Sequence, residues 1–457
     1  MKGILSDNQR NYLFYHLNFF VDLNDELKSR ISFNASIHSE TQAKIVFPQS
    51  EKPFDVNQII LIQDIPVLFP ISEINEFYSV QGNSVIFHHD MLKSAFYLLS
   101  GYQETITPER DFMGRFPYEK SIQKKLGIVS KPVVNYYFDI ITAGIKTFCE
   151  LNHISFTKKR MFDTFGYMLS HDIDRVDAYN IWEVGHKLKQ CLGLSATNYS
   201  KSAAWLVFAT YFVNWLNPFN KKNPYWNFEY LRTIEKQYDI HSTFYFLENE
   251  TLHLDSRYSF SEKRIVKLIA WLESEGCEIG VHGTIKSAKN SNSVLNNLRH
   301  LQQVSKQTII GIRQHCLHYE LPFTATIQEQ AGFSYDTTLT FAEHEGFRNS
   351  CCTPFKPYDF AGDRMIDVWE IPLTIMDGTL FYYRKLSFEQ MWHETEKLLN
   401  EVQRFHGIFA LLWHNTMFDE AEFPGITAFY EQYQRHILSR NPQSVTGVGL
   451  MNKLVVL

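Results

Sequence analysis

Apolar, strand-like runs alternate with helix-like segments from about residue 160 to the end of this 457-residue chain. The runs lie at 164–170, 241–247, 277–282, 308–313, 335–341, 367–375 and 408–414. Between them apolar residues recur at intervals of three and four, as they do at 265, 268, 269 and 272, which is typical of a helix with one buried face. This alternation predicts parallel strands joined by crossover helices. A distorted (β/α) barrel of about seven strands accounts for the pattern better than an open sheet does.

The first part of the chain has a different organisation. Short β-like runs at 43–47, 58–62 and 84–87 and one helical stretch at 91–99 predict a small α+β accessory domain over residues 1–130. Residues 131–160 are interpreted as a connecting helix and linker. Residues 161–457 then form the barrel, with an aromatic-rich insertion near 195–225. Two domains are also what the chain length indicates, because one hydrophobic core seldom serves so many residues.

Net charge and cysteine spacing limit the classes of binding partner and the cellular location that we expect. A formal net charge of −6 gives no support for a nucleic-acid partner. The six cysteines show no CxxC spacing and the first residues do not resemble a signal peptide, so we expect reduced thiols and a cytoplasmic location. The apolar segment 203–216 is too short to span a bilayer. We expect it to be a buried core helix, or alternatively a helix that lies on a membrane surface.

Polar residues follow the predicted strands, where a barrel of this kind carries its active site. Asp172 and Asp174 end the first strand, and their spacing makes both side chains point the same way. Carboxylates in such a pair can hold a metal ion and accept a proton from water. The other residues at strand ends are His282, Arg313 with His315, Asp377 and His414.

Four of these strand ends resemble the motifs of one enzyme family. They are Ser-His-Asp-Ile-Asp at 170–174, Glu-Ile-Gly-Val-His at 278–282, Gly-Ile-Arg at 311–313 and the strand 408–414. In their order they resemble the NodB-type polysaccharide deacetylases, carbohydrate esterase family 4, over about residues 160–440. The resemblance implies a distorted barrel that removes acetyl groups from sugars with one divalent metal ion. It also implies Asp172 as base, Asp174 and His282 as metal ligands, Arg313 as a brace for the base, His414 as general acid and Leu412 in the acetyl pocket.

The sequence departs from that family at its second histidine motif. The position four residues after His282 is Lys286, and a protonated lysine cannot ligate a metal. His315 is the best-placed substitute for the third ligand, ahead of His318 and His344. Alternatively, water completes a weak or incomplete site, or the charge of Lys286 replaces the metal.

These residues predict a metal-dependent hydrolase, with zinc as the expected metal, that acts on an N-acetylated sugar of a surface polysaccharide or its precursor. Asp377 or Glu370 would hold His414 or pair with Arg313, unless each only forms a salt bridge at the rim. Trp369 and Trp413 would stack on sugar rings or else fill the core. Two other functions remain open: an inactive barrel that binds carbohydrate, and a hydrolase of a non-sugar C–N bond.

Overall fold

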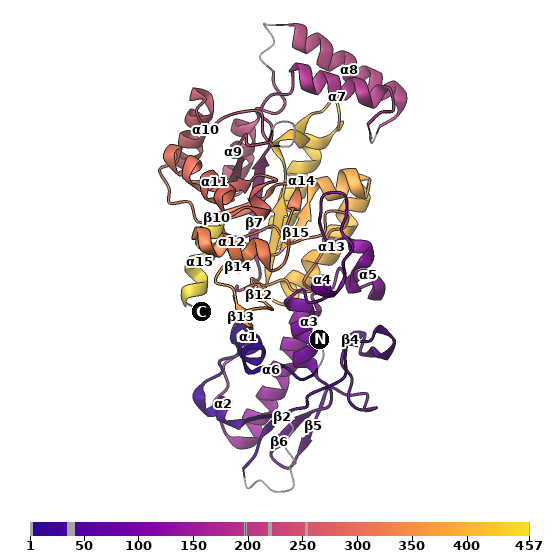
Figure 1. Ribbon diagram of the computed structural model, residues 1–457, viewed down its shortest axis with the longest axis vertical. Helices are drawn as coiled ribbons and strands as arrows, with labels where there is room; N and C mark the ends of the chain where they lie inside the picture. Colours follow the sequence, from indigo (N-terminus) through magenta and orange to yellow (C-terminus); the bar gives the residue numbers. More distant parts are fainter. Residues whose placement is uncertain are drawn as a thin grey trace.

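The computed structural model describes residues 3–33, 42–195, 197, 199–217, 222–251 and 255–456 (Figure 1). Within them the main sheet has nine strands in the order β14-β11-β10-β9-β8-β7-β16-β15, with β17 beside β7. All neighbouring strands in this sheet are parallel. The strands are β7 (Gly166–Ile173), β8 (Ser242–Leu247), β9 (Glu278–Gly283), β10 (Gly311–Gln314), β11 (Tyr335–Asp336), β14 (Trp369–Glu370), β15 (Leu373–Met376), β16 (Ile408–Leu412) and β17 (Gln443–Ser444).

One segment of chain joins the two ends of this sheet. β14 pairs with β11, and β15, which begins three residues after β14 ends, pairs with β16. The sheet therefore curls into a distorted (β/α) barrel, as predicted. With β14 and β15 counted as one segment and β17 as an outer neighbour of β7, the described strands occupy seven positions, which agrees with the expected number.

Helices follow the strands along the chain and lie around the barrel, except for α7 and α8, which form a projecting hairpin. The helices are α7 (Ile181–Cys191), α8 (Lys201–Leu216), α9 (Phe228–Gln237), α10 (Lys263–Ser274), α11 (Ser291–Val304), α12 (Phe323–Ala331), α13 (Phe388–Arg404), α14 (Ile426–Leu438) and α15 (Gly447–Val456). In α10 the four residues with helical spacing, 265, 268, 269 and 272, are all buried, as predicted. They belong to the apolar layer between helices and strands.

Large side chains fill the inside of the barrel. Tyr245 and Tyr335 are fully buried there, and their hydroxyl groups lie 3.1 Å apart. Gly280 and Gly311 make room for these rings, since a Cβ at either glycine would lie within 2.5 Å of a tyrosine atom. The barrel is thus packed like a core, and a binding site is left only at its mouth.

The N-terminal part packs a mixed four-stranded sheet, in the order β1-β2-β6-β5, against helices. Its elements are α1 (Asp7–Leu17), α2 (Asp25–Arg30), β1 (Ile31–Phe33), β2 (Ile45–Phe47), β3 (Ile60–Ile62), β4 (Ile65–Val67), β5 (Tyr78–Gln81), β6 (Ser84–Phe87), α3 (Met91–Leu99), α4 (Gln103–Ile106), α5 (Ile122–Leu126) and α6 (Val133–Asn152). The core of this part continues into the barrel chain, because it includes Leu339, Phe355 and Val368. A fully buried ion pair, Arg348 with Glu104, also crosses between the two parts.

The α7–α8 hairpin differs from what the sequence predicts. It projects from the end of the molecule opposite the N-terminal sheet (Figure 1), so α8 is not the buried core helix that was expected. Only Ala204, Val207 and Tyr211 of α8 are buried, because α8 packs mainly on α7. Its exposed apolar residues are Trp205, Leu206, Phe212, Val213, Trp215 and Leu216. No helix among the described residues is long and apolar enough to cross a membrane.

Candidate active site

The ends of β7, β9, β10 and β16 bring the predicted polar residues to one cavity of about 320 Å³. Its lining includes Asp172, Asp174, His282, His315 and His414. Asp172 is the second-last residue of β7 and Asp174 follows the strand, so the two carboxylates face the same way. The strand ends therefore converge at the mouth of the barrel, where a (β/α) barrel holds its reacting groups.

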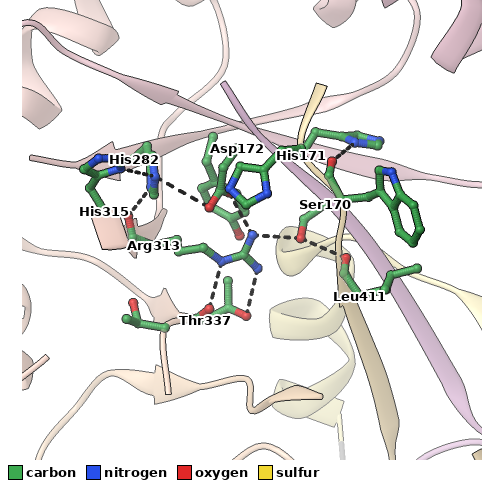
Figure 2. Close-up of polar contacts among 12 residues, drawn as sticks. Ser170, His171, Asp172, His282, Arg313, His315, Thr337 and Leu411 are labelled. Carbon is green, nitrogen blue, oxygen red and sulfur yellow. Dashed lines mark hydrogen bonds and ion pairs between the residues drawn. The ribbon is translucent and has the colours of Figure 1, made fainter. Parts of the chain in front are cut away.

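Arg313 lies next to Asp172 and forms an ion pair with it (Figure 2). Its Nη1 atom donates hydrogen bonds to Oδ1 of Asp172 at 2.8 Å and to Oγ of Ser170 at 2.9 Å. Its Nε atom donates to the carbonyl oxygen of Thr337 at 2.9 Å. Both charged side chains are buried, at 0% and 2% exposure, so the pair is shielded from water and its geometry is strongly held. Oδ2 of Asp172 stays on the cavity side, 3.6 Å from Nε2 of His282.

Asp174, His282 and His315 form a group of three potential metal ligands. One ligand atom from each lies within 4.8 Å of the other two. Nε2 of His282 lies 3.2 Å from Oδ1 of Asp174 and 3.1 Å from Nδ1 of His315. No other such group of three histidine, cysteine or acidic side chains occurs in the described part of the chain.

The chemistry of this group fits a cation. Nδ1 of His282 lies 2.8 Å from the carbonyl oxygen of Arg313, and a carbonyl only accepts, so Nδ1 carries the hydrogen of the neutral ring. Nε2 is then the unprotonated nitrogen, and it points toward Asp174 and His315, an arrangement common among ligand histidines. Oδ1 of Asp174 is buried and receives no well-aligned hydrogen bond from the described residues. Two imidazoles and one carboxylate are a donor set that zinc accepts.

Asp174 and His315 attract each other, and this attraction shifts the pKa values of both side chains. Burial alone would raise the pKa of Asp174, but the neighbouring imidazole of His315 outweighs burial and holds the pKa of Asp174 well below the usual range. Burial would lower the pKa of His315, but the charge of Asp174 outweighs it and raises that pKa well above the usual value. His315 therefore keeps a proton in the metal-free protein, and a metal ion has to displace it.

His414 is held by Asp377 at the other side of the cavity. Its Nδ1 atom lies 2.7 Å from Oδ1 of Asp377, and its Nε2 atom lies 3.8 Å from Oδ2 of Asp174. Burial lowers the pKa of His414, but the contact with Asp377 dominates and raises the pKa to about 9. Of the two acids that were weighed for this contact, Asp377 makes it. Glu370 instead accepts a hydrogen bond from the backbone of Leu339.

The other candidates for the third ligand lie elsewhere. Lys286 forms an ion pair with Glu250 at 3.3 Å and is 57% exposed, so its charge is directed away from Asp174. His344 donates from Nδ1 to the carbonyl oxygen of Glu345, and His318 lies beside Gly114. Of these residues His315, directly after β10, lies beside Asp174, with 3.5 Å between Nδ1 and Oδ1. The two residues that follow it, at 316 and 317, have left-handed backbone.

Three further residues are not placed as the sequence predicts. Trp369 lies at the start of its strand and packs on Tyr15 of α1 and on Phe19, which follows that helix, and it does not line the cavity. Trp413 is fully buried under α14, where it contacts Tyr430, because successive residues of a strand face opposite sides. Leu412 belongs to the packed interior of the barrel and is fully buried. Of the two roles that the sequence leaves open for these tryptophans, the structure shows packing against other aromatic residues and not stacking on sugar.

The structure also adds residues that the sequence analysis did not assign to the site. Phe112, Met113 and Arg115 of the N-terminal part line the cavity, together with Met376 and Tyr383. A second cavity of about 310 Å³ shares Asp174 and His315 and extends toward α7. Its other lining residues are Arg175, Trp182, Glu183, His186, Leu247, Asp255 and Arg257. No local sequence pattern marks these residues, since they reach the site from other segments.

Comparisons with known proteins give slight likenesses. Residues 6–149 match a family of unknown function (DUF7033). No curated protein matches the chain. A probable polysaccharide deacetylase from Pseudomonas aeruginosa PAO1 is 12% identical, with a TM-score of 0.42 and coverage of 63% of this chain and 90% of that one. The PuuE allantoinase is 14% identical, with a TM-score of 0.41 and coverage of 64% and 90%.

A third solved structure, BA3943 from Bacillus anthracis, is described as a CE4 family pseudoenzyme. It is 11% identical to this chain, with a TM-score of 0.31 and coverage of 64% of this chain and 66% of that one. The solved structures that this chain resembles therefore include a polysaccharide deacetylase, an allantoinase and a pseudoenzyme. The barrel itself is defined by the strand order and register of this chain.

Proposed function

We propose that this chain is a metal-dependent hydrolase that removes acetyl groups from an N-acetylated sugar of a surface polysaccharide or its precursor. One observation supports the proposal above all others. Three potential metal ligands, a carboxylate paired with arginine and a histidine paired with a carboxylate line the same cavity. These are the groups that hydrolysis of an acetyl amide needs at one place.

Asp174, His282 and His315 would hold the metal, and zinc suits their nitrogen and oxygen donors. When bound, such an ion supplies Lewis acidity toward a carbonyl oxygen and acidifies water. The backbone contact of His282 with Arg313 orients the imidazole for this role. His315 takes the place of the second histidine that the resembling family carries where this chain has Lys286.

Asp172 and His414 carry out the two proton transfers of the reaction. Oδ1 of Asp172 is occupied by Arg313, so Oδ2 is the atom that takes a proton from water as the water adds to the acetyl carbonyl. His414 donates a proton to the amine nitrogen as the C–N bond breaks. With a pKa raised to about 9, His414 is protonated at neutral pH and is ready to act as an acid. The products are acetate and a free amino sugar.

Acetate release and metal content test this proposal together. Purified protein should hold close to one equivalent of zinc by mass spectrometry and should release acetate from oligomers of N-acetylglucosamine. Asp172→Asn should abolish release, whereas Asp367→Asn, at a carboxylate 81% exposed outside the cavity, should not change it. Stoichiometric metal without acetate release, from these oligomers or from a panel of small amides, would contradict a hydrolase.

The two alternatives predict different outcomes of the same assays. A barrel that only binds carbohydrate would retain sugar affinity but would show no turnover with or without added zinc. A hydrolase of a non-sugar C–N bond would turn over members of the amide panel and leave N-acetylated sugars intact. We favour the deacetylase because the cavity combines the polar centre with an apolar wall of Met113, Leu317 and Met376, which suits an acetyl methyl group.

We further propose that the α7–α8 hairpin rests on a membrane surface. The exposed side of α8 presents Trp205, Leu206, Val213 and Trp215, and the helix contains no acidic residue. A helix with aromatic and aliphatic residues on its free side suits the boundary between lipid headgroups and acyl chains. The hairpin begins next to the second cavity, which Trp182 of α7 lines, so a substrate attached to a lipid would reach the site from this side.

A further inference from the structure

We infer that the turn Asp111–Arg115 of the N-terminal part completes the active site: Arg115 positions the turn that carries His315, and Phe112 stacks on a sugar ring next to the acetylated one. The inference rests on the function proposed above and specifies its substrate as an oligosaccharide. It also assigns to the N-terminal part a direct role in the site. In Figure 1 the segment that follows α4 rises along the side of the barrel.

The turn is internally well ordered. Oδ1 of Asp111 accepts hydrogen bonds from the backbone nitrogens of Met113 and Arg115, at 2.9 and 2.8 Å. The backbone nitrogen of Asp111 donates to the carbonyl oxygen of Arg115 at 2.9 Å, which closes the turn. Gly114 has φ +79°, a conformation that other residues adopt at a cost. The turn can therefore hold a side chain in a defined place.

Arg115 fastens this turn to the barrel. Its side chain is only 6% exposed, and its Nε atom donates to Oδ2 of Asp111 at 2.7 Å. Nη1 donates to the carbonyl oxygen of Cys316 at 2.9 Å, and Nη2 donates to the hydroxyl oxygen of Tyr383 at 3.1 Å. One guanidinium thus joins the N-terminal part to two separate segments of the barrel mouth.

The hydrogen bond from Arg115 to Cys316 lies next to His315, the third potential metal ligand. Cys316 and Leu317, directly after His315, have φ values of +56° and +54°. Two consecutive non-glycine residues in the left-handed region are unfavourable unless surrounding contacts hold them. The hydrogen bond from Arg115 holds the carbonyl between them, so it keeps His315 directed toward Asp174. Arg115 is a positioning residue in this scheme.

Phe112 is a large apolar side chain in an ordered turn, and it is nevertheless almost fully exposed. Its side chain is 87% exposed, although it lines the cavity that contains Asp172 and His282. The guanidinium of Arg115 lies 6.0 Å from its ring centre, which leaves most of the ring surface to solvent. A pyranose ring has an apolar face that suits an aromatic surface of this kind. Since the cavity itself is about 320 Å³, a neighbouring sugar of the substrate would lie over Phe112.

The second cavity supports a substrate of more than one sugar. It begins at Asp174 and His315, is not lined by Phe112, and extends to Trp182. The guanidinium of Arg257 lies 4.5 Å from the centre of the Trp182 ring. The candidate centre therefore has room beyond the first cavity, which suits removal of an acetyl group from one sugar of an oligosaccharide.

The test of Phe112 compares substrates of two lengths. For the tetramer of N-acetylglucosamine, Phe112→Ala should raise KM about tenfold and change kcat less than about threefold. For the monomer it should change neither constant, and Phe112→Tyr should restore the tetramer KM. Phe323→Ala, at a phenylalanine 46% exposed that lines neither cavity, is the matched control and should behave as wild type. Equal KM values for wild type and Phe112→Ala on the tetramer would overturn the role of Phe112.

The test of Arg115 uses zinc affinity, measured by competition with a chelator. Arg115→Lys keeps the charge but loses the double contact, so zinc affinity should fall about tenfold. Tyr383→Phe removes only one of the two contacts and serves if the lysine variant does not fold; it should lower zinc affinity by a smaller factor. Unchanged zinc affinity in both variants would overturn the positioning role.

These measurements separate the inference from the function on which it rests. If the wild-type protein releases no acetate, the proposed hydrolase fails, and calorimetric binding of the tetramer then tests the turn. Phe112→Ala should still lose about tenfold in affinity relative to Phe323→Ala. Equal affinities of these two variants would overturn the inference as well.

Discussion

His282 and Asp174 face each other across the mouth of the barrel, with 3.2 Å between Nε2 and Oδ1. The imidazole is oriented from behind by the carbonyl oxygen of Arg313, 2.8 Å from Nδ1. Arg313 thus supports both halves of the site, since its guanidinium also pairs with Asp172.

Replacing Asp172 by Asn should remove acetate release and leave the fold intact. Asparagine has the same shape and can still accept the hydrogen bond from Arg313, but it cannot take a proton from water. We expect kcat to fall at least about a hundredfold, within the usual range for loss of a general base. Turnover of N-acetylated sugar and the circular dichroism spectrum are the measurements, and a folded variant with wild-type turnover would reject Asp172 as the base.

His315→Ala should weaken zinc binding, whereas Lys286→Ala should not. The first change removes one of three candidate ligands, and the second removes a side chain that pairs with Glu250 away from the centre. We expect a loss of at least about tenfold in zinc affinity for His315→Ala, in line with the effect of disturbing a metal site. If Lys286→Ala lowers zinc affinity as much as His315→Ala does, the ligand assignment is wrong.

Activity should decline as the pH rises through about 9. His414 must be protonated to act as an acid, and the contact with Asp377, acting against burial, raises its pKa to about 9. A histidine with a raised pKa also contributes stability that is complete below about pH 6.5, its usual pKa, and is lost as the pH rises through 9. The pH profile of kcat is the measurement.

Asp377→Asn is the control for that profile. The substitution removes the negative charge that raises the pKa of His414, so the alkaline limb should move toward neutral pH. An alkaline limb that stays near pH 9 in Asp377→Asn would show that another group controls it.

Trp205→Ala combined with Trp215→Ala should reduce binding to anionic liposomes. Both side chains are exposed on α8, at 49% and 37%, and tryptophan favours the membrane interface. Wild-type protein should sediment with the liposomes and the double variant should remain in the supernatant. Trp226→Ala, at a residue 37% exposed outside the hairpin, is the control. If the wild-type protein does not sediment, the membrane proposal fails.

Glu104→Gln should destabilise the whole chain. Glu104 and Arg348 form a bidentate ion pair, in which Nε and Nη2 of Arg348 lie 3.0 and 2.8 Å from the carboxylate oxygens. The side chain of Glu104 is 4% exposed and that of Arg348 is 1% exposed. Loss of the carboxylate charge would leave a buried guanidinium uncompensated, at a cost of about 3 kcal/mol in the free energy of unfolding. Urea unfolding measures the change. Glu109→Gln, in an exposed pair with Lys120, should leave the urea midpoint close to that of the wild type.

The same ion pair bears on the division of the chain. The sequence predicts an accessory domain over 1–130, a linker over 131–160 and a barrel over 161–457, and these boundaries stay a prediction. The N-terminal core shares Leu339, Phe355 and Val368 with the barrel chain. If this shared core is needed for stability, residues 161–457 produced alone should unfold at lower urea concentration than the full chain.

Local patterns were sufficient to predict the barrel and the placement of Asp172, Asp174, His282, Arg313 and His414. Strand and helix periodicity depends on neighbouring residues, and the carboxyl ends of parallel strands necessarily meet at one face. The sequence alone therefore predicts that residues at those strand ends lie close together. The same reasoning left two roles open for Trp413, and its side chain fills the core, because a shift of one residue along a strand turns a side chain from the cavity to the helix layer.

Contacts between distant segments were decided only by the tertiary structure. His315 lies beside Asp174 and is followed by two left-handed residues, and Arg115, about two hundred positions earlier, donates a hydrogen bond to the carbonyl between them. The exposure of α8 likewise depends on what packs against it, since an apolar helix is buried only where another surface covers it. Periodicity depends only on residues that are close in the sequence. Which segment packs against a given loop or helix face depends on the packing of the whole chain.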